Sequence, residues 1–135
     1  MTPQNDLMIL VGRVLMALLF IVSGFGKLMA AAGTKAYFAK IGVPVPEIAY
    51  IVAVAVELGV GILFLVGIKT RIMAVVLAVF AVATAVLGHG ELAQQTQFLK
   101  NLAIAGGFLG FAVLGGGAYS VDGQMARSGR GRVRV

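Results

Sequence analysis

Residues 48–68 read IAYIVAVAVELGVGILFLVGI and residues 72–87 read IMAVVLAVFAVATAVL, with only Lys69, Thr70 and Arg71 between them. A helix that crosses the ~30 Å hydrocarbon core of a bilayer needs roughly 20 mainly apolar residues. The two stretches therefore predict two membrane spans. Because the connection between them is so short, the spans are expected to form a tight antiparallel hairpin.

Two more apolar stretches flank this hairpin. Residues 7–28 predict a first span that contains Arg13, and residues 101–118 predict a glycine-rich fourth span. Residues 14–26 of the first stretch have the length of a signal peptide's apolar region, but residues 7–12 are already apolar, where a basic segment would stand. We therefore expect a retained span.

The connections between these spans differ in character. Residues 34–41, TKAYFAKI, can form two helical turns with apolar side chains on one side, and glycine and prolines follow. This pattern predicts a short amphipathic helix in the membrane interface, between spans one and two. Residues 88–100 contain Gly-His-Gly-Glu and three glutamines, and they predict a solvated loop.

The composition also indicates an integral membrane protein. Hydrophobic residues make up 60% of the 135 residues, charged residues 12%, and the mean hydropathy is +1.01. A soluble domain carries about 25% charged residues, and a disordered chain has low hydrophobicity, so both classes are excluded. The sequence predicts an all-α integral membrane four-helix bundle over residues 1–124, followed by a basic cytoplasmic tail over residues 125–135.

Several kinds of chemistry are excluded by the residue inventory. The chain has no cysteine, which removes disulfides, thiolate metal sites and a thiol redox relay. A single histidine, His89, cannot build a bis-histidine haem site or a multi-histidine zinc site. We therefore expect no metal and no intrinsic cofactor.

The net charge of +6 is concentrated near span ends and in the tail. This placement indicates contact with an anionic membrane surface, and we expect no nucleic-acid partner. The side with both termini carries six basic residues against four on the other, which predicts cytoplasmic termini. The six are Lys69, Arg71, Arg127, Arg130, Arg132 and Arg134, and the four are Lys27, Lys35, Lys40 and Lys100.

Two charges lie in the interior of predicted spans, away from the span ends, where an ionisable side chain costs several kcal/mol unless it is paired or hydrated. Glu57 lies near the middle of span two, and Arg13 lies roughly 7 Å from the middle of span one at 1.5 Å per residue. This depth predicts a buried Arg13–Glu57 ion pair. Such a pair either fixes the packing of the bundle, or it leaves Glu57 to handle protons or bind a head group.

A second polar group is expected at the outer ends of the spans. Depth places Lys27, His89 and Lys100 at one level, and Phe20 lies on the same face of span one as Lys27. These four residues predict an outer vestibule that could bind an anion, a lipid phosphate or a quinone carbonyl. The alternative is that the lysines simply extend to the interface and the histidine is hydrated.

An ordered set of motifs resembles the DoxX family. The set begins with residues 12–27, GRVLMALLFIVSGFGK, and continues with GVP at 42–44, ELGVG at 57–61 and GIKTR at 67–71. It ends with His89, Lys100-Asn101 and GGGAYSVD at 115–122. The resemblance covers about residues 7–124, and the small bacterial inner-membrane branch is the most similar.

The resemblance implies a four-helix bundle in the bacterial inner membrane, with polar family positions at Arg13, Lys27, Glu57, Arg71, His89 and Lys100. Members of the family are linked with quinone-dependent sulfur oxidation, with oxidative-stress complexes and with responses to aromatic compounds. Similar four-helix thiol oxidases use cysteine pairs, and that chemistry is excluded here.

Three functions remain open from the sequence. The first is a non-catalytic subunit or binder that takes a quinone or a lipid head group in the outer vestibule and works with a redox or stress-response partner. The second is a quinone-reactive oxidoreductase component in which Glu57 or His89 passes protons. The third is a small transporter of hydrophobic or aromatic compounds, which would require homo-oligomers.

Overall fold

The computed structural model describes residues 1–88 and 92–132, and these residues are helical apart from short turns. The elements are α1 (Pro3–Met29), α2 (Ala31–Lys40), α3 (Pro46–Val54), the π-helical turn η1 (Ala55–Val60), α4 (Gly61–Val66), α5 (Thr70–Gly88), the 3-10 turn η2 (Leu92–Gln94), α6 (Gln95–Leu114) and α7 (Val121–Arg132). The predicted all-α class is confirmed.

Four helical stretches are long and apolar enough to cross a membrane. They are α1, the continuous helix α3–η1–α4 (Pro46–Val66), α5, and η2 with α6 (Leu92–Leu114). The expected four-span bundle is therefore present, and α2 is the expected short helix between the first two spans, beginning three residues earlier than predicted. Helix α7 runs through the predicted boundary at residue 124.

The fourth span is shifted from its predicted position. Its helix begins at Gln95, so that residues 95–100 of the predicted loop are helical, and it ends at Leu114. Gly115 follows with a φ of +80°, a conformation that suits glycine and ends the helix. Polar residues extend the helix at the other end because a helix satisfies its own backbone hydrogen bonds, even where its side chains leave the apolar layer.

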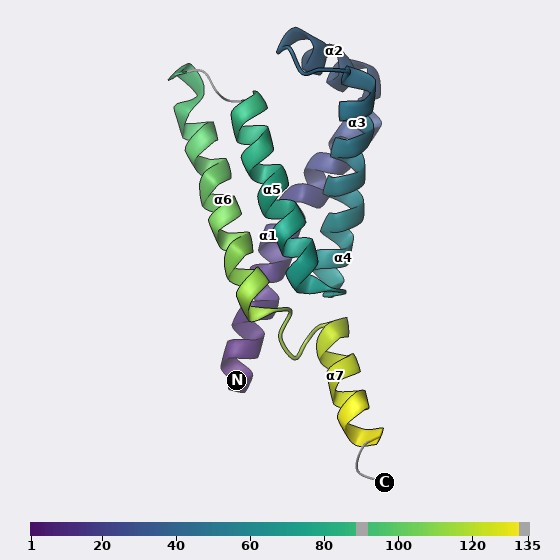
Figure 1. Cartoon of the computed structure of the whole chain (residues 1–135), viewed down its shortest axis with the longest axis vertical. Coiled ribbons are helices and arrows are strands. Elements are labelled where there is room, and N and C mark those ends of the chain that lie inside the picture. Colours follow the sequence, from purple (N-terminus) through teal and green to yellow (C-terminus); the bar gives the residue numbers. More distant parts are fainter. Residues whose placement is uncertain (89–91, 133–135) are drawn as a thin grey trace.

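The helices run between two ends of the bundle (Figure 1). The terminal end carries the N-terminus, the α4–α5 turn and α7, and the opposite end, called the α2 end below, is covered on one side by α2. Helix α6 packs along α5, and α1 packs against η1 and α4. The bundle therefore has two halves, one of α5 and α6 and the other of α1 with α3–η1–α4. The two halves lie further apart near the α2 end (Figure 1).

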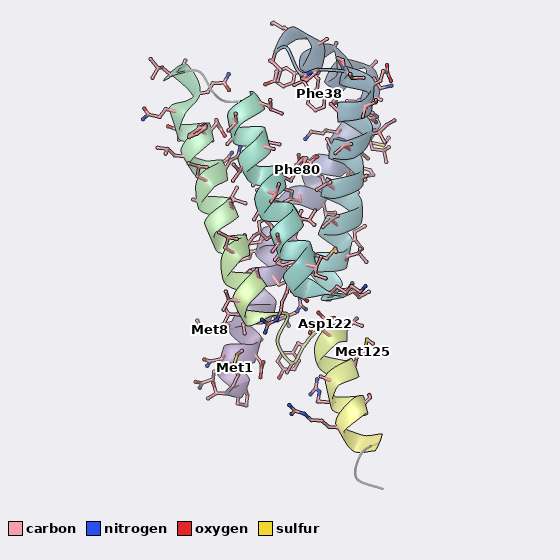
Figure 2. All side chains as sticks on the ribbon, viewed as in Figure 1. Met1, Met8, Phe38, Phe80, Asp122 and Met125 are labelled. Atoms are coloured by element: carbon pink, nitrogen blue, oxygen red, sulfur yellow. The ribbon has the colours of Figure 1, made fainter. Side chains whose placement is uncertain are left out.

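The core lies where the two halves meet. Phe64 of α4 and Phe108 of α6 are fully buried, with ring centroids 5.1 Å apart in an edge-to-face arrangement. Leu77 and small residues such as Ala74 and Ala81 bring α5 close to them. Large apolar side chains such as Leu15 and Val79 are instead exposed, as expected for a surface that faces lipid. Figure 2 shows side chains projecting outward along the helices.

Candidate functional site

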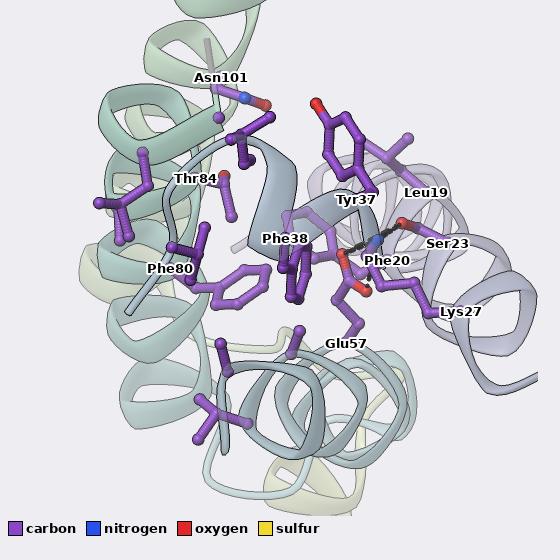
Figure 3. A pocket seen from close by; sticks show the side chains of 18 of the residues that line it. Leu19, Phe20, Ser23, Lys27, Tyr37, Phe38, Glu57, Phe80, Thr84 and Asn101 are labelled. Atoms are coloured by element: carbon purple, nitrogen blue, oxygen red, sulfur yellow. Dashed lines mark hydrogen bonds and ion pairs between the residues drawn. The ribbon is translucent and has the colours of Figure 1, made fainter. Parts of the chain in front are cut away.

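A cavity of about 410 Å³ opens between the two halves of the bundle near the α2 end. Its walls come from α1, α2, α3 and α5, with η1 beneath and the start of α6 at the rim. The rings of Phe20, Phe38 and Phe80 line the interior (Figure 3), and Phe20 and Phe80 pack edge to face with centroids 6.2 Å apart. The space is therefore mainly apolar and partly aromatic, as small-molecule sites commonly are.

One wall of this cavity carries a partly buried polar cluster of Ser23, Lys27 and Glu57 (Figure 3). Lys27 Nζ lies 3.1 Å from Glu57 Oε1 and 3.0 Å from Oε2, and it donates to Ser23 Oγ at 2.7 Å. Ser23 Oγ in turn donates to Glu57 Oε1 at 3.1 Å. The side chain of Glu57 is 7% exposed and that of Lys27 is 25% exposed.

Local structure brings these three side chains together. Ser23 and Lys27 lie four residues apart on α1, so they face the same way one turn apart. Glu57 lies in η1, a π-helical turn of the kind often found at functional positions. Gly24 lets the helices approach, because a Cβ at this position would lie 2.8 Å from Glu57 Cβ.

The predicted Arg13–Glu57 ion pair is wrong, although both side chains are buried as expected. Glu57 lies across from Gly24, whereas Arg13 lies against the end of α4, where its Nε donates to the Leu65 carbonyl at 2.9 Å. The inference from span midpoints therefore misplaced α1 along its axis, and it is Lys27 that meets Glu57.

Arg13 instead ties the C-terminal segment to the bundle. Its guanidinium donates to the carbonyl oxygens of Gly116 and Tyr119, the latter at 2.5 Å, in addition to Leu65. The planar group with five donors suits three acceptors in different directions. The polar backbone of residues 115–120 thus has a buried partner at the terminal end.

The predicted vestibule is realised in part. Lys27, Lys100 and Phe20 all line the same cavity. Lys100 is exposed at the rim and donates to Gln97 Oε1 at 2.5 Å, while Lys27 is held by Glu57. His89 lies outside the described residues.

Several site residues were not predicted from the sequence. Ser23 could have been found, because a serine one turn before Lys27 on a buried face is a natural partner for an ammonium. Tyr37 of α2 and Asn101 of α6 also line the cavity, near its rim (Figure 3). No sequence pattern predicts that these two residues line one cavity, since the placement of α2 relative to α6 depends on the tertiary fold.

Asp122 forms a further contact at the terminal end that the sequence did not reveal. Its carboxylate accepts hydrogen bonds from the backbone N–H groups of Lys69 and Thr70 and from the Thr70 hydroxyl, each at 2.8 Å. Burial alone would raise the pKa of Asp122, but the hydrogen bonds from Thr70 and Lys69, together with the Arg13 charge, lower the pKa below its ordinary value. The carboxylate thereby caps the N-terminus of α5.

Helix α7 and the start of α5, which carry most of the residues predicted as a basic membrane surface, lie at the terminal end (Figure 1). Lys69 and Arg71 flank the start of α5 and are exposed, as are Arg127 and Arg130 on α7. Arg127 Nη2 donates to the Ala118 carbonyl at 2.6 Å, which holds α7 near the preceding segment. Arg132 belongs to α7, and Arg134 lies outside the described residues.

Comparisons with known proteins agree with this architecture. The DoxX family model matches residues 8–90, which is more than half of the chain. The inner membrane protein YqjF of Escherichia coli (strain K12) is 41% identical over 125 residues, covering 90% of this chain and 95% of YqjF. The inner membrane protein YphA of the same organism is 39% identical over 126 residues, covering 87% of this chain and 90% of YphA. Among solved structures, the chain has no match.

The family model covers the first two spans, the third span and the polar cluster, and both relatives extend the similarity over nearly the whole chain. Together with four helices that can cross a membrane, these matches identify the class of protein. The chain belongs to the DoxX family of integral membrane proteins.

Proposed function

We propose that the protein is a non-catalytic binder of the bacterial inner membrane that holds a molecule of the quinone class in the cavity near the α2 end. The observation that carries the proposal is an apolar, aromatic cavity of about 410 Å³ with a partly buried polar cluster on its wall. Apolar walls with a few fixed polar groups are the usual form of a site for a small amphiphile. The inner-membrane location is supported by the names of the two E. coli relatives.

The charges of the cavity favour a neutral ligand over a lipid phosphate. Lys27 is neutralised by Glu57 at 3.0 Å, so the wall cluster has no net charge. Among the described residues, Lys100 at the rim is the one lining cation besides Lys27, so an anion deeper in the cavity would leave water without meeting an unpaired cation of that part of the chain. Lys100 lies at the exposed rim and makes no ion pair with any of the residues that the structure describes. A quinone ring with its two neutral oxygens suits this environment better.

The same residues indicate a binding role, with electrons supplied by another protein. The chain has no cysteine, and none of its side chains stores electrons as a redox cofactor does. A bound quinone would therefore be reduced or oxidised by a redox or stress-response partner at the membrane. In this proposal the protein positions the ring through Phe20, Phe38 and Phe80 and orients its oxygens at the polar cluster.

We further propose that both termini face the cytoplasm. The terminal end gathers Lys69, Arg71 and the arginines of α7, and an excess of basic residues marks the cytoplasmic side. Fusions of alkaline phosphatase and of green fluorescent protein to the C-terminus test this orientation. Fluorescence without phosphatase activity is expected, and the reverse result would overturn the orientation while leaving the binding site unaffected.

The binding function is tested by extracting the full chain from its own membrane into native nanodiscs and identifying what remains bound by mass spectrometry. A quinone-class molecule near one per chain is expected. Ala83→Phe places a ring in the cavity and should remove the ligand, whereas Val82→Phe changes the neighbouring, outward-exposed position and should retain it. Phospholipid alone in the wild-type protein, or equal quinone content in both variants, would overturn the proposal.

A further inference from the structure

The cavity near the α2 end has two edges of different chemistry. Tyr37 of α2 and Asn101 of α6 give one edge a polar rim (Figure 3). At the other edge, between α3 and α5, the lining side chains include Val52 and Leu87. Val52 is 49% exposed and Leu87 is 55% exposed although both line the cavity, so this apolar edge is continuous with the lipid-facing surface.

The packing of α5 leaves this apolar edge open. Helix α5 packs closely against α6, α4 and η1, and of these α4 and η1 lie deeper in the bundle than α3. The two helices α3 and α5 therefore diverge towards the α2 end (Figure 1). The side chains of Ala49 and Ala53, which line the cavity from α3, are too small to fill the space between them.

The apolar edge lies at the depth of the hydrocarbon layer. Val52 follows Pro46, the start of its span, by six residues, which corresponds to about 9 Å of helix. Ala83, which also lines the cavity, precedes the end of α5 at Gly88 by five residues, or about 8 Å. Since each span has about the length of a ~30 Å hydrocarbon core, this edge faces acyl chains and not head groups.

Helix α2 and the turn that follows it cover the cavity on the side of the interface. Phe38, Ile41 and Val43 line the cavity from there. Phe38 lies below α2, and Phe80 lies further down, between α5 and α3 (Figure 2). A ligand that arrives from the bilayer between α3 and α5 does not have to pass this cover.

We propose that the ligand enters the cavity sideways from the bilayer, between α3 and α5, and that its long hydrocarbon tail remains in the lipid at this edge. This inference rests on the proposed function and names the ligand class, a long-tailed quinone dissolved in the membrane. The cavity of about 410 Å³ then has to hold the ring alone. The tail stays among acyl chains, which are as apolar as the side chains of Val52 and Leu87.

The first test locates the tail on the unaltered full chain in nanodiscs. The probe is a benzoquinone with a decyl tail that carries a diazirine at its end. After illumination, labelled residues are identified by mass spectrometry, with and without an excess of plain decyl benzoquinone as competitor. Labelling that the competitor removes is expected beside the apolar edge, at the exposed residues Ile48 and Val52 of α3 and Val79 of α5.

The second test narrows the apolar edge. Val52→Trp places a large side chain there, and Ile51→Trp is the matched control, because Ile51 is 62% exposed and does not line the cavity. Calorimetry in nanodiscs gives the affinities for decyl benzoquinone and for the same ring with a methyl group in place of the tail. Val52→Trp should weaken binding of the decyl compound roughly tenfold more than that of the methyl compound, which can enter at the polar rim. Ile51→Trp should leave the ratio of the two affinities unchanged.

The outcomes separate this inference from the proposed function. Competed labels that lie only on α1 and α6, or only within the cavity, overturn entry between α3 and α5 and leave quinone binding standing. Equal losses for the decyl and methyl compounds in Val52→Trp have the same meaning. Failure of both compounds to bind the wild-type protein overturns the proposed function itself.

Discussion

At the scale of single residues, Glu57 and Lys27 stabilise each other inside the bundle, 3.0 Å apart. Glu57→Gln and Lys27→Met should each lower the free energy of unfolding by roughly 1–3 kcal/mol, because each leaves a partly buried charge without its partner. The double variant should lose less than the sum of the two. Equilibrium unfolding in mixed micelles measures the free energies of unfolding of the wild type, the two single variants and the double variant. Lys100→Ala, at the exposed rim, should stay near wild type, and additive losses would contradict the pairing.

Arg13 occupies a position that requires the guanidinium group of an arginine. It is 1% exposed, and its guanidinium serves the carbonyls of Leu65, Gly116 and Tyr119. Arg13→Lys retains the charge but cannot reach three acceptors from one ammonium, so we expect a loss of about 3 kcal/mol in the same unfolding assay. The matched change Arg71→Lys, at an exposed position, should have little effect. Equal stabilities of the two variants would refute the bridging role of Arg13.

At the scale of elements, the contact between α1 and η1 depends on the absence of a side chain at Gly24. A Cβ there would lie 2.8 Å from Glu57 Cβ and 3.0 Å from the Leu58 backbone nitrogen. Gly24→Ala should therefore separate the helices, weaken the Lys27–Glu57 contact and destabilise the protein by roughly 1–3 kcal/mol. Thermal unfolding measures the change.

Gly26→Ala is the control for this prediction. Gly26 lies on the same helix and is exposed, and a Cβ at this position would have no atom of the described residues within 4 Å. Alanine is the better helix former by about 1 kcal/mol, so this change should be neutral or stabilising. A melting temperature for Gly24→Ala as high as that for Gly26→Ala would show that the close approach is not required.

At the scale of the whole molecule, hydrogen bonds between segments far apart in the chain hold the terminal end together. Asp6 Oδ1 accepts a hydrogen bond from the Ala118 N–H at 2.9 Å, and Asp122 holds the N-terminus of α5. The C-terminal segment thereby joins α1 to the hairpin of α4 and α5. Loss of one contact should loosen the assembly of all three.

The lowered pKa of Asp122 makes the stabilisation by its hydrogen bonds to Lys69 and Thr70 dependent on pH. A carboxyl whose pKa is lower in the folded state stabilises fully above its unfolded pKa of ~3.9, and the contribution is lost as the pH falls through the folded pKa. Wild type should therefore melt at a higher temperature than Asp122→Asn at pH 7, and the gap should close as the pH is lowered below 4. The exposed Glu47→Gln should not show this closing gap, and a gap for Asp122→Asn that stayed constant down to pH 3 would contradict the assignment.

Much of this architecture could be predicted from hydropathy and turn residues. The spans at residues 48–68 and 72–87 agree with α3–α4 and α5 to within a few residues, and the short helix before Pro44 is present as α2. The fourth span was displaced, because Gly115 ends the helix earlier than composition indicated and polar residues extend its start. Burial of Glu57 was also predicted correctly, from its position near the middle of a span. Arg13 is buried as expected, but against backbone carbonyls and not against Glu57.

Hydropathy and residue spacing are enough to predict the membrane class, the four spans and the buried charges, because the thickness of the bilayer and the cost of charge within it act on each helix separately. Only the tertiary structure decided that Glu57 meets Lys27 and that Arg13 meets the C-terminal segment. The relative shift of two packed helices depends on small contacts such as Gly24 against Glu57. One helical turn moves a side chain by about 5.4 Å, which is enough to exchange one ionic partner for another.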